Sequence, residues 1–134
     1  MWLELQGIVA NAVRAALPGV AVATVVDAVV PDVDTVRVTR ASSPARALFQ
    51  QLSGVEALAV ECWTRNDDPD LASAQLQALE RDVLAALRGI TRIDPITTID
   101  ITGIDPDGDL FRPAVGSRIN LTISWRKPRQ SHTH

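Results

Sequence analysis

Hydrophobic positions recur at helical spacing in two stretches of the chain, and the first stretch lies at its start. Residues 2–17 carry apolar side chains three or four positions apart, which is the spacing of one helix face. Pro18-Gly19 follows directly and ends the pattern. The sequence therefore predicts a first amphipathic helix with an inward face of Leu5, Ile8, Val9, Ala12, Ala16 and Leu17.

The second helical pattern is longer and more regular. Asp68 is a candidate N-cap for it, because it directly precedes Pro69, and proline is favoured at the first helical position. Gly89 stands near the end of the pattern, where helices commonly stop. These features predict a helix packed on a sheet, with Ala72, Leu76, Leu79, Val83, Leu87 and Ile90 facing inward.

Five other segments have the alternation or the β-branched composition of strands. The last is the clearest, because apolar residues alternate strictly with polar ones from Arg118 to Arg126, which predicts an antiparallel strand with one buried face. In the fourth, Ile96, Thr98 and Asp100 are expected to share a face. The predicted strands are residues 20–26, 35–39, 56–65, 96–101 and 118–126.

The segments between the strands predict how the strands are connected. Pro31-Asp32-Val33-Asp34 separates the first two strands, so we expect these to form a hairpin. Residues 41–54 match neither a strand nor a long helix, and we interpret them as an excursion with at most one or two helical turns. Asp105-Pro106-Asp107-Gly108-Asp109 opens a long loop that reaches Gly116.

The element order α-β-β-β-α-β-β predicts the fold class. It indicates an α+β two-layer domain, in which a mostly antiparallel sheet of about five strands carries two helices on one face. The 134 residues suffice for one core but not for two. We expect a single domain over residues 1–127 and a flexible C-terminal tail over residues 128–134.

Composition and charge narrow the classes of function. The apolar fraction is 46% and the charged fraction 22%, as in soluble globular domains. A net charge of -3 provides no field that would attract a phosphate backbone, which disfavours generic nucleic-acid binding. Cys62 is the single cysteine, so no intramolecular disulfide can form and a buried apolar role is expected. The sequence has neither a signal peptide nor a membrane span, which predicts a cytosol-like compartment and no membrane partner.

Each cluster that suggests chemistry has a simpler structural interpretation. The aspartates from Asp105 onward alternate as in a calcium loop, but Gly116 stands where an EF-hand needs its bidentate glutamate. Asp67, Asp68 and Asp70 suit the N-terminus of a helix, whose dipole attracts carboxylates. The terminal Ser-His-Thr-His lacks the fixed geometry that ligation or proton transfer requires. No nucleophile elbow or glycine-rich phosphate loop is present. We therefore expect no enzyme, no catalytic residue, no cofactor and no metal.

Charged residues at strand faces and turns suggest a protein-binding surface. Arg37, Arg118 and Arg126 fall on predicted strands, and acidic turns lie around Asp32 and Asp107. A ring of identical subunits could pair such groups head to tail. A solvated face with scattered charge explains these residues equally well.

The whole pattern resembles the tail terminator family of long-tailed bacteriophages, especially those of actinobacterial hosts. The resemblance spans residues 2–127 and depends on element order and on a few apolar and Trp positions. Relatives often carry glycine near residues 41–43, where this chain has Ala41-Ser42-Ser43. The segments that carry the resemblance are Ala16-Leu17-Pro18, Thr35-Val36-Arg37-Val38, Val60-Glu61-Cys62-Trp63-Thr64-Arg65, the helix from Leu71 to Leu87, a Pro/Asp loop and the strand from Arg118 to Arg126.

The resemblance implies a structural role in the virion, at the junction of tail and neck, after assembly in the host cytoplasm. The family forms a homo-oligomeric ring, expected to be a hexamer, that caps the major tail-tube protein, stops its polymerisation and joins it to a head-completion or connector protein. DNA only passes through the lumen. The residues expected to contact partners are Arg40, Arg46, Phe49, Arg112 and Arg126; Phe49 could be an anchor or could close over its own core.

Three alternatives remain open at this point. A head-completion or connector protein of the phage neck would share size and ring formation. A ferredoxin-like module that binds a small ligand or RNA would share the helices on an antiparallel sheet. An enzyme whose site arises only at a subunit interface is the third.

Overall fold

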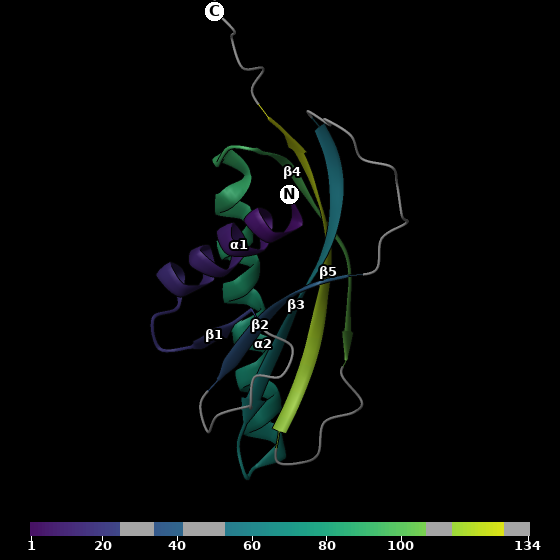
Figure 1. The fold of residues 1–134 in the computed structure, drawn as a ribbon. Helices are drawn as coiled ribbons and strands as arrows, with labels where there is room; N and C mark the ends of the chain where they lie inside the picture. The colour runs from purple at the N-terminus through teal and green to yellow at the C-terminus, as the bar shows by residue number, and fades with distance from the viewer. Residues whose placement is uncertain (25–33, 42–52, 107–113, 128–134) are drawn as a thin grey trace, which may run out of the picture.

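The computed structural model describes residues 1–24, 34–41, 53–106 and 114–127. In this part of the chain two helices cover one face of a five-stranded sheet, and the expected element order and α+β class are confirmed (Figure 1). We call the helix-covered face of the sheet the inner face and the opposite face the outer face. The elements are α1 (Trp2–Ala16), β1 (Ala21–Ala23), β2 (Thr35–Arg40), β3 (Ser53–Arg65), α2 (Pro69–Gly89), the 3-10 turn η1 (Ile90–Arg92), β4 (Ile96–Pro106) and β5 (Ala114–Arg126).

The strands lie in the order β1-β2-β3-β5-β4, so β1 and β4 form the two edges of the sheet. The pairs β2–β3, β3–β5 and β4–β5 are antiparallel, as expected. The expected hairpin between the first two strands is wrong, because β1 runs parallel to β2, with Ala21 opposite Thr35. A pattern of apolar residues reports the face that each residue occupies but not the direction of its strand, and only a connection that crosses back permits parallel pairing. Most of that connection, residues 25–33, lies outside the described residues.

Helix α1 packs on the sheet through a face that is rotated from the expected one. Leu5, Val9 and Val13 are fully buried, whereas Ala16 is exposed, so the expectation for Ala16 is wrong. The buried face includes the polar Gln6, which hides the true centre of the face from a search for apolar residues. Burying an amide costs free energy unless it is hydrogen-bonded. The Gln6 Nε2 donates to the carbonyl oxygens of Val38 at 2.8 Å and Thr24 at 3.1 Å, which ties α1 to β2 and to the end of β1.

Helix α2 forms as the sequence predicts. Asp68 is its N-cap, and the Asp68 carboxylate accepts a hydrogen bond from the backbone N–H of Asp70 at 2.9 Å. Pro69 occupies the first turn, where its missing N–H has no cost. Ala72, Leu79, Val83 and Leu87 are buried against the sheet, and η1 then adds the buried Ile90. Both helices therefore contribute to one continuous core.

The strands that line this core supply alternate side chains. From β5, Ile119, Leu121, Ile123 and Trp125 face inward, so the expected alternation of this strand is confirmed. The helices and the inner face together form a single apolar cluster. Its strand residues are Val36 and Val38 of β2, Leu58, Val60 and Cys62 of β3, Ile96 of β4, and Ile119, Leu121, Ile123 and Trp125 of β5.

Strand β4 differs from its expected alternation, because it contains two β-bulges. Its register on β5 shifts between Ile96 and Thr98 and again between Ile101 and Gly103. Each bulge adds one residue, so isoleucines three positions apart stay on one face. Ile96, Ile99, Ile101 and Ile104 consequently all lie opposite inward-facing residues of β5, and the expectation that Ile96 shares a face with Thr98 and Asp100 is wrong.

The extra residues at the bulges are threonines whose side chains bind β5. The Thr97 hydroxyl donates to the Ser124 carbonyl at 3.0 Å, and the Thr102 hydroxyl donates to the Asn120 carbonyl at 3.1 Å. Side-chain hydrogen bonds thus replace main-chain ones where the ladder is interrupted.

The ends of several strands also differ from expectation, and β1 covers only Ala21–Ala23 of the strand expected over residues 20–26. β4 continues through Asp105 and Pro106, and β5 begins at Ala114, so the expected loop from Asp105 to Gly116 is wrong at both ends. Turn-forming residues are compatible with the end of an edge strand, where a missing N–H leaves no ladder bond broken. β3 begins at Ser53 and not at Glu56. The expected excursion lies almost entirely outside the described residues.

Candidate interaction surface

The outer face of the sheet is polar and carries no helix among the described elements (Figure 1). Alternation places every second residue of β2, β3 and β5 on this face. The register aligns these residues in rows that cross the strands, and small residues fill the central rows. One such row joins Thr39, Ala59, Asn120 and Gly103, and another joins Ala57, Thr122 and Asp100. Ala59, in the first of these rows, is fully buried.

One row of the outer face consists of charged residues with alternating sign. Arg37 of β2 lies opposite Glu61 of β3, Glu61 lies opposite Arg118 of β5, and Arg118 lies opposite Asp105 of β4. We call these four residues the charged row. Opposite charges on directly opposed positions stabilise strand pairing. The order of charges in the row therefore favours the observed register of these strands.

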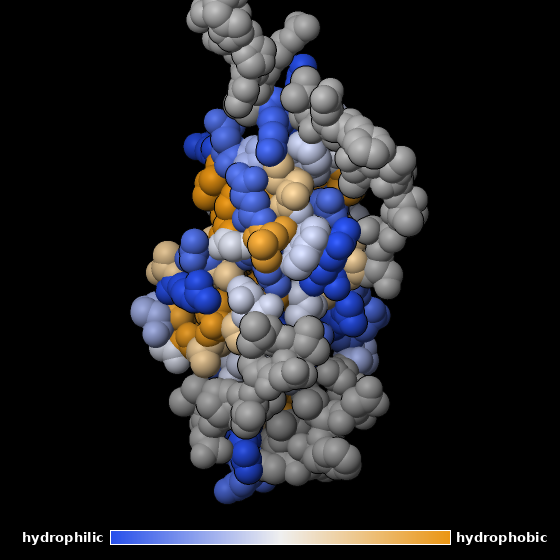
Figure 2. Space-filling view, in the orientation of Figure 1, coloured by the Kyte–Doolittle hydropathy of each residue, from blue (hydrophilic) through white to orange (hydrophobic). Residues whose placement is uncertain are grey.

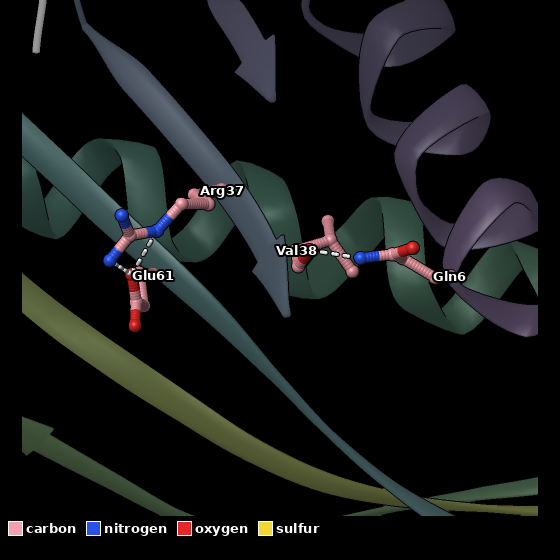
Figure 3. A network of polar contacts seen from close by, with 4 residues as sticks. All are labelled: Gln6, Arg37, Val38 and Glu61. Atoms are coloured by element: carbon pink, nitrogen blue, oxygen red, sulfur yellow. Dashed lines mark hydrogen bonds and ion pairs between the residues drawn. The ribbon is translucent and has the colours of Figure 1, made fainter. Parts of the chain in front are cut away.

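The Arg37 end of the charged row is largely buried. The Arg37 guanidinium forms an ion pair with the Glu61 carboxylate, and its Nε donates to Glu61 Oε2 at 2.6 Å (Figure 3). The same guanidinium lies 4.6 Å from the centre of the Trp63 ring, within the range of a cation–π contact. Both side chains of the pair are only 13–16% exposed. Arg37, Glu61 and Trp63 therefore form a structural cluster in which the charge of Arg37 is paired.

Trp63 is buried, but it lies outside the main core. It is 4% exposed and lies on the outer face, opposite Thr35 and Gly116. Its Nε1 has no hydrogen-bond partner among the described residues. Trp63 therefore packs the outer side of the sheet, whereas Trp125 packs the inner side.

The Asp105 end of the charged row is open to solvent. Asp105 is exposed, and its Oδ2 accepts a hydrogen bond from the Asn120 side chain at 2.9 Å. Asp100, on the same strand and face, is exposed as well. On the inner face of β4, Ile101 and Ile104 are 41% and 42% exposed. β4 thus presents carboxylates on one side and isoleucines on the other.

Two of the five expected contact residues lie in the described part of the chain. Arg40 ends β2, where its guanidinium stacks 5.1 Å from the Trp2 ring centre and lies 3.9 Å from the Glu56 carboxylate. These contacts attach the end of β2 to the start of α1 and leave the Arg40 side chain 45% exposed. Arg126 ends β5 and is exposed. The structure does not bring these two residues together in any described contact, and Arg46, Phe49 and Arg112 lie outside the described residues.

The one cysteine of the chain is buried. Cys62 is fully buried on the inner face, and burial raises the pKa of its thiol to about 12, with smaller contributions from Glu80 and Glu61. A thiol with such a pKa is protonated and inert at neutral pH. Among the described residues no group of three or more His, Cys, Asp or Glu is placed to hold a metal. No helix in this part of the chain is long and apolar enough to span a membrane.

The surface of the described residues is mixed in hydropathy. Hydrophilic residues dominate the described surface in Figure 2, and apolar residues appear between them as separate patches. The charged row and the β4 edge could not be predicted from the sequence pattern, because they depend on pairing register. The two bulges shift that register, and isoleucines at spacings of three, two and three are the signal that could have revealed them.

Comparison with known proteins does not identify a family. No protein-family model and no curated protein matches the chain. Among solved structures it is similar to the core domain of a protein from Akkermansia muciniphila, with 14% sequence identity and a TM-score of 0.34. That similarity covers 70% of this chain and 47% of the other, so this chain spans about half the length of the protein it matches.

Proposed function

We propose that this chain is a phage tail terminator, a structural subunit whose ring caps the tail tube and stops its growth. The observation that supports this proposal most is the fold: the α-β-β-β-α-β-β order, on which the resemblance depends, with both helices on one face of the sheet. The role needs surfaces for neighbouring subunits and no chemistry. A polar sheet face is such a surface.

The mechanism is competition for one interface. A ring bound to the end of the tube buries the surface that the next tube subunit would use, so elongation stops when the ring binds. A second surface of the same ring is then free to receive the head-completion or connector protein. Arg126, exposed at the end of β5, is a contact residue in this proposal, and so is the exposed part of Arg40.

A ferredoxin-like module receives no support from the fold. Such domains follow the order β-α-β-β-α-β, whereas this chain begins with a helix and has three strands before its second helix. A head-completion protein remains the closest alternative, since it would share size and assembly. Location in the particle separates the two roles: antibody label at the distal end of the head–tail joint favours the terminator, and label on tailless heads favours head completion.

The proposal is tested by assembling tail tubes in the presence of this protein. The tube protein encoded in the same genome is polymerised with increasing amounts of the chain, and tube lengths are measured by electron microscopy. We expect the mean length to fall as the protein is added, with density capping one end. Tubes of unchanged length and bare ends at every concentration would exclude the role.

A further inference from the structure

Strand β4 is the longer and the more exposed of the two sheet edges. It extends from Ile96 to Pro106 and pairs with β5 on one side, while no described strand pairs with its other side. Along β4 most residues are exposed, including Thr98, Asp100 and Asp105. An exposed edge strand presents main-chain donors and acceptors that an extended segment can use.

The side chains of β4 specify the chemistry of such a segment. On the outer face, Asp100 and Asp105 present carboxylates, and β4 carries no basic residue. On the inner face, Ile101 and Ile104 leave about two fifths of their surface exposed. A segment added beside β4 would therefore place cationic side chains on the outer face and apolar ones on the inner face.

The charged row also predicts a positively charged partner segment. Arg37, Glu61, Arg118 and Asp105 alternate in charge across four strands, and the row ends with a carboxylate at the open edge. A fifth strand that continues the alternation brings a cation beside Asp105. On β5 the residues opposite Asp105 and Asp100 are Arg118 and Thr122, four positions apart, so the matching segment carries basic residues at that spacing.

A second copy of this chain fits the edge poorly. Pairing β4 with another β4 adds carboxylates to carboxylates with no cation on either strand, and like charges on paired strands are destabilising. The other edge strand, β1, has three residues, and the Arg14 side chain lies 3.5 Å from the Val22 carbonyl on it. Carboxylates and bulges on an edge disfavour self-pairing, while the same carboxylates favour a basic partner.

We propose that the β4 edge binds an extended basic segment of a different protein by strand addition. Main-chain hydrogen bonds to β4 hold the segment, arginine or lysine side chains lie beside Asp100 and Asp105, and apolar side chains cover Ile101 and Ile104. This binding surface goes beyond the terminator role, because it belongs to the fold and would serve a head-side protein equally.

The experiment uses a fluorescent synthetic peptide in which two arginines flank a valine-threonine-valine core. Binding to the full chain is measured by fluorescence anisotropy at low salt. We expect saturable binding that weakens on the order of tenfold in the double variant Asp100→Asn/Asp105→Asn, as loss of two exposed ion pairs predicts. The control variant Asp82→Asn removes an exposed carboxylate on α2 and should bind the peptide as the wild type does.

Two further peptides separate strand addition from general charge attraction. One carries N-methyl groups on alternate residues, which keeps the charge but removes main-chain donors, and the other has glutamate in place of arginine. We expect neither to bind, and we expect the original peptide to slow hydrogen exchange of β4 amides. Equal binding of the N-methylated peptide, or wild-type binding by the double variant, would overturn the proposal. So would β4 protection that rises with protein concentration alone, since that indicates a second copy at the edge.

Discussion

The inner and outer faces of the sheet are built from different interactions. On the inner face, Leu58, Leu121 and Ile123 are at most 1% exposed and join one cluster with residues of both helices. On the outer face, the charged row crosses four strands, and its exposed end at Asp105 lies on an open edge. Apolar burial is strong and non-directional, whereas paired charges are weaker and select register. The two faces thus depend on different residues, and each can be changed separately.

The largest difference between the faces is expected from truncations of neighbouring β5 residues. Leu121→Ala should lower the free energy of unfolding by about 2–5 kcal/mol, because it leaves a cavity in the core. Thr122→Ala on the outer face should change it by less than about 1 kcal/mol. Chemical denaturation of both variants measures this contrast. Equal losses would mean that the outer face is also part of a core.

Breaking the ion pair tests whether the outer face contributes specificity more than stability. Glu61→Leu leaves the largely buried Arg37 guanidinium without its carboxylate. It should lower the free energy of unfolding by on the order of 2 kcal/mol, which is less than the loss for a fully buried pair. The double variant Arg37→Met/Glu61→Leu should recover most of that loss. Denaturation midpoints of the three proteins measure the effect. A double variant that is no more stable than the single one would contradict this expectation, because it would show that Arg37 stabilises the fold without Glu61.

Gly54 tests how closely the inner face is packed. A Cβ added at Gly54 would lie 2.9 Å from the Trp125 ring, so Gly54→Ala should cost about 1–3 kcal/mol through overpacking. Gly103→Ala is the matched control on β4, because its new Cβ meets no atom within 4 Å. In a Trp125→Leu background the cost of Gly54→Ala should shrink, as measured by thermal unfolding. A cost that is unchanged in that background would show that Trp125 is not the obstacle.

The smallest expected effect is a pH dependence from Cys62. Its thiol has a folded-state pKa of about 12 against an ordinary value of 9.0. The unfolded chain therefore loses this proton first as pH rises above 9, and stability should fall by about 1.4 kcal/mol per pH unit until the folded thiol ionises. A Cys62→Ala variant should lack this component when unfolding is compared at pH 8 and pH 10. An identical pH dependence in both proteins would exclude it.

The fold could be predicted from sequence wherever a single period governs a segment. Strict alternation in β5 and the capped helix after Asp68 specify both elements without tertiary information. The direction of β1 could not be predicted, because alternation does not encode it. The buried face of α1 was predicted wrongly because it includes Gln6, a polar residue. Its amide donates hydrogen bonds to two backbone carbonyls that only the folded chain brings near.

The interaction surface could be predicted only in part. The arginines on β2 and β5 were expected on strand faces, and Arg37 and Arg118 do lie in one row. Their partners Glu61 and Asp105 depend on register, and the register of β4 depends on two bulges that alternation conceals. Arg40 was expected at a partner surface, but part of its side chain contacts Trp2 and Glu56 of its own chain.

We propose that this chain ends the growth of a tail tube through surface contacts alone. The most direct test of this proposal is the tail length in particles from a phage that lacks the gene, measured by electron microscopy. We expect tubes of unregulated length that are not joined to heads, with normal tails restored when the gene is supplied. Tails of normal length, joined to heads without this protein, would contradict it.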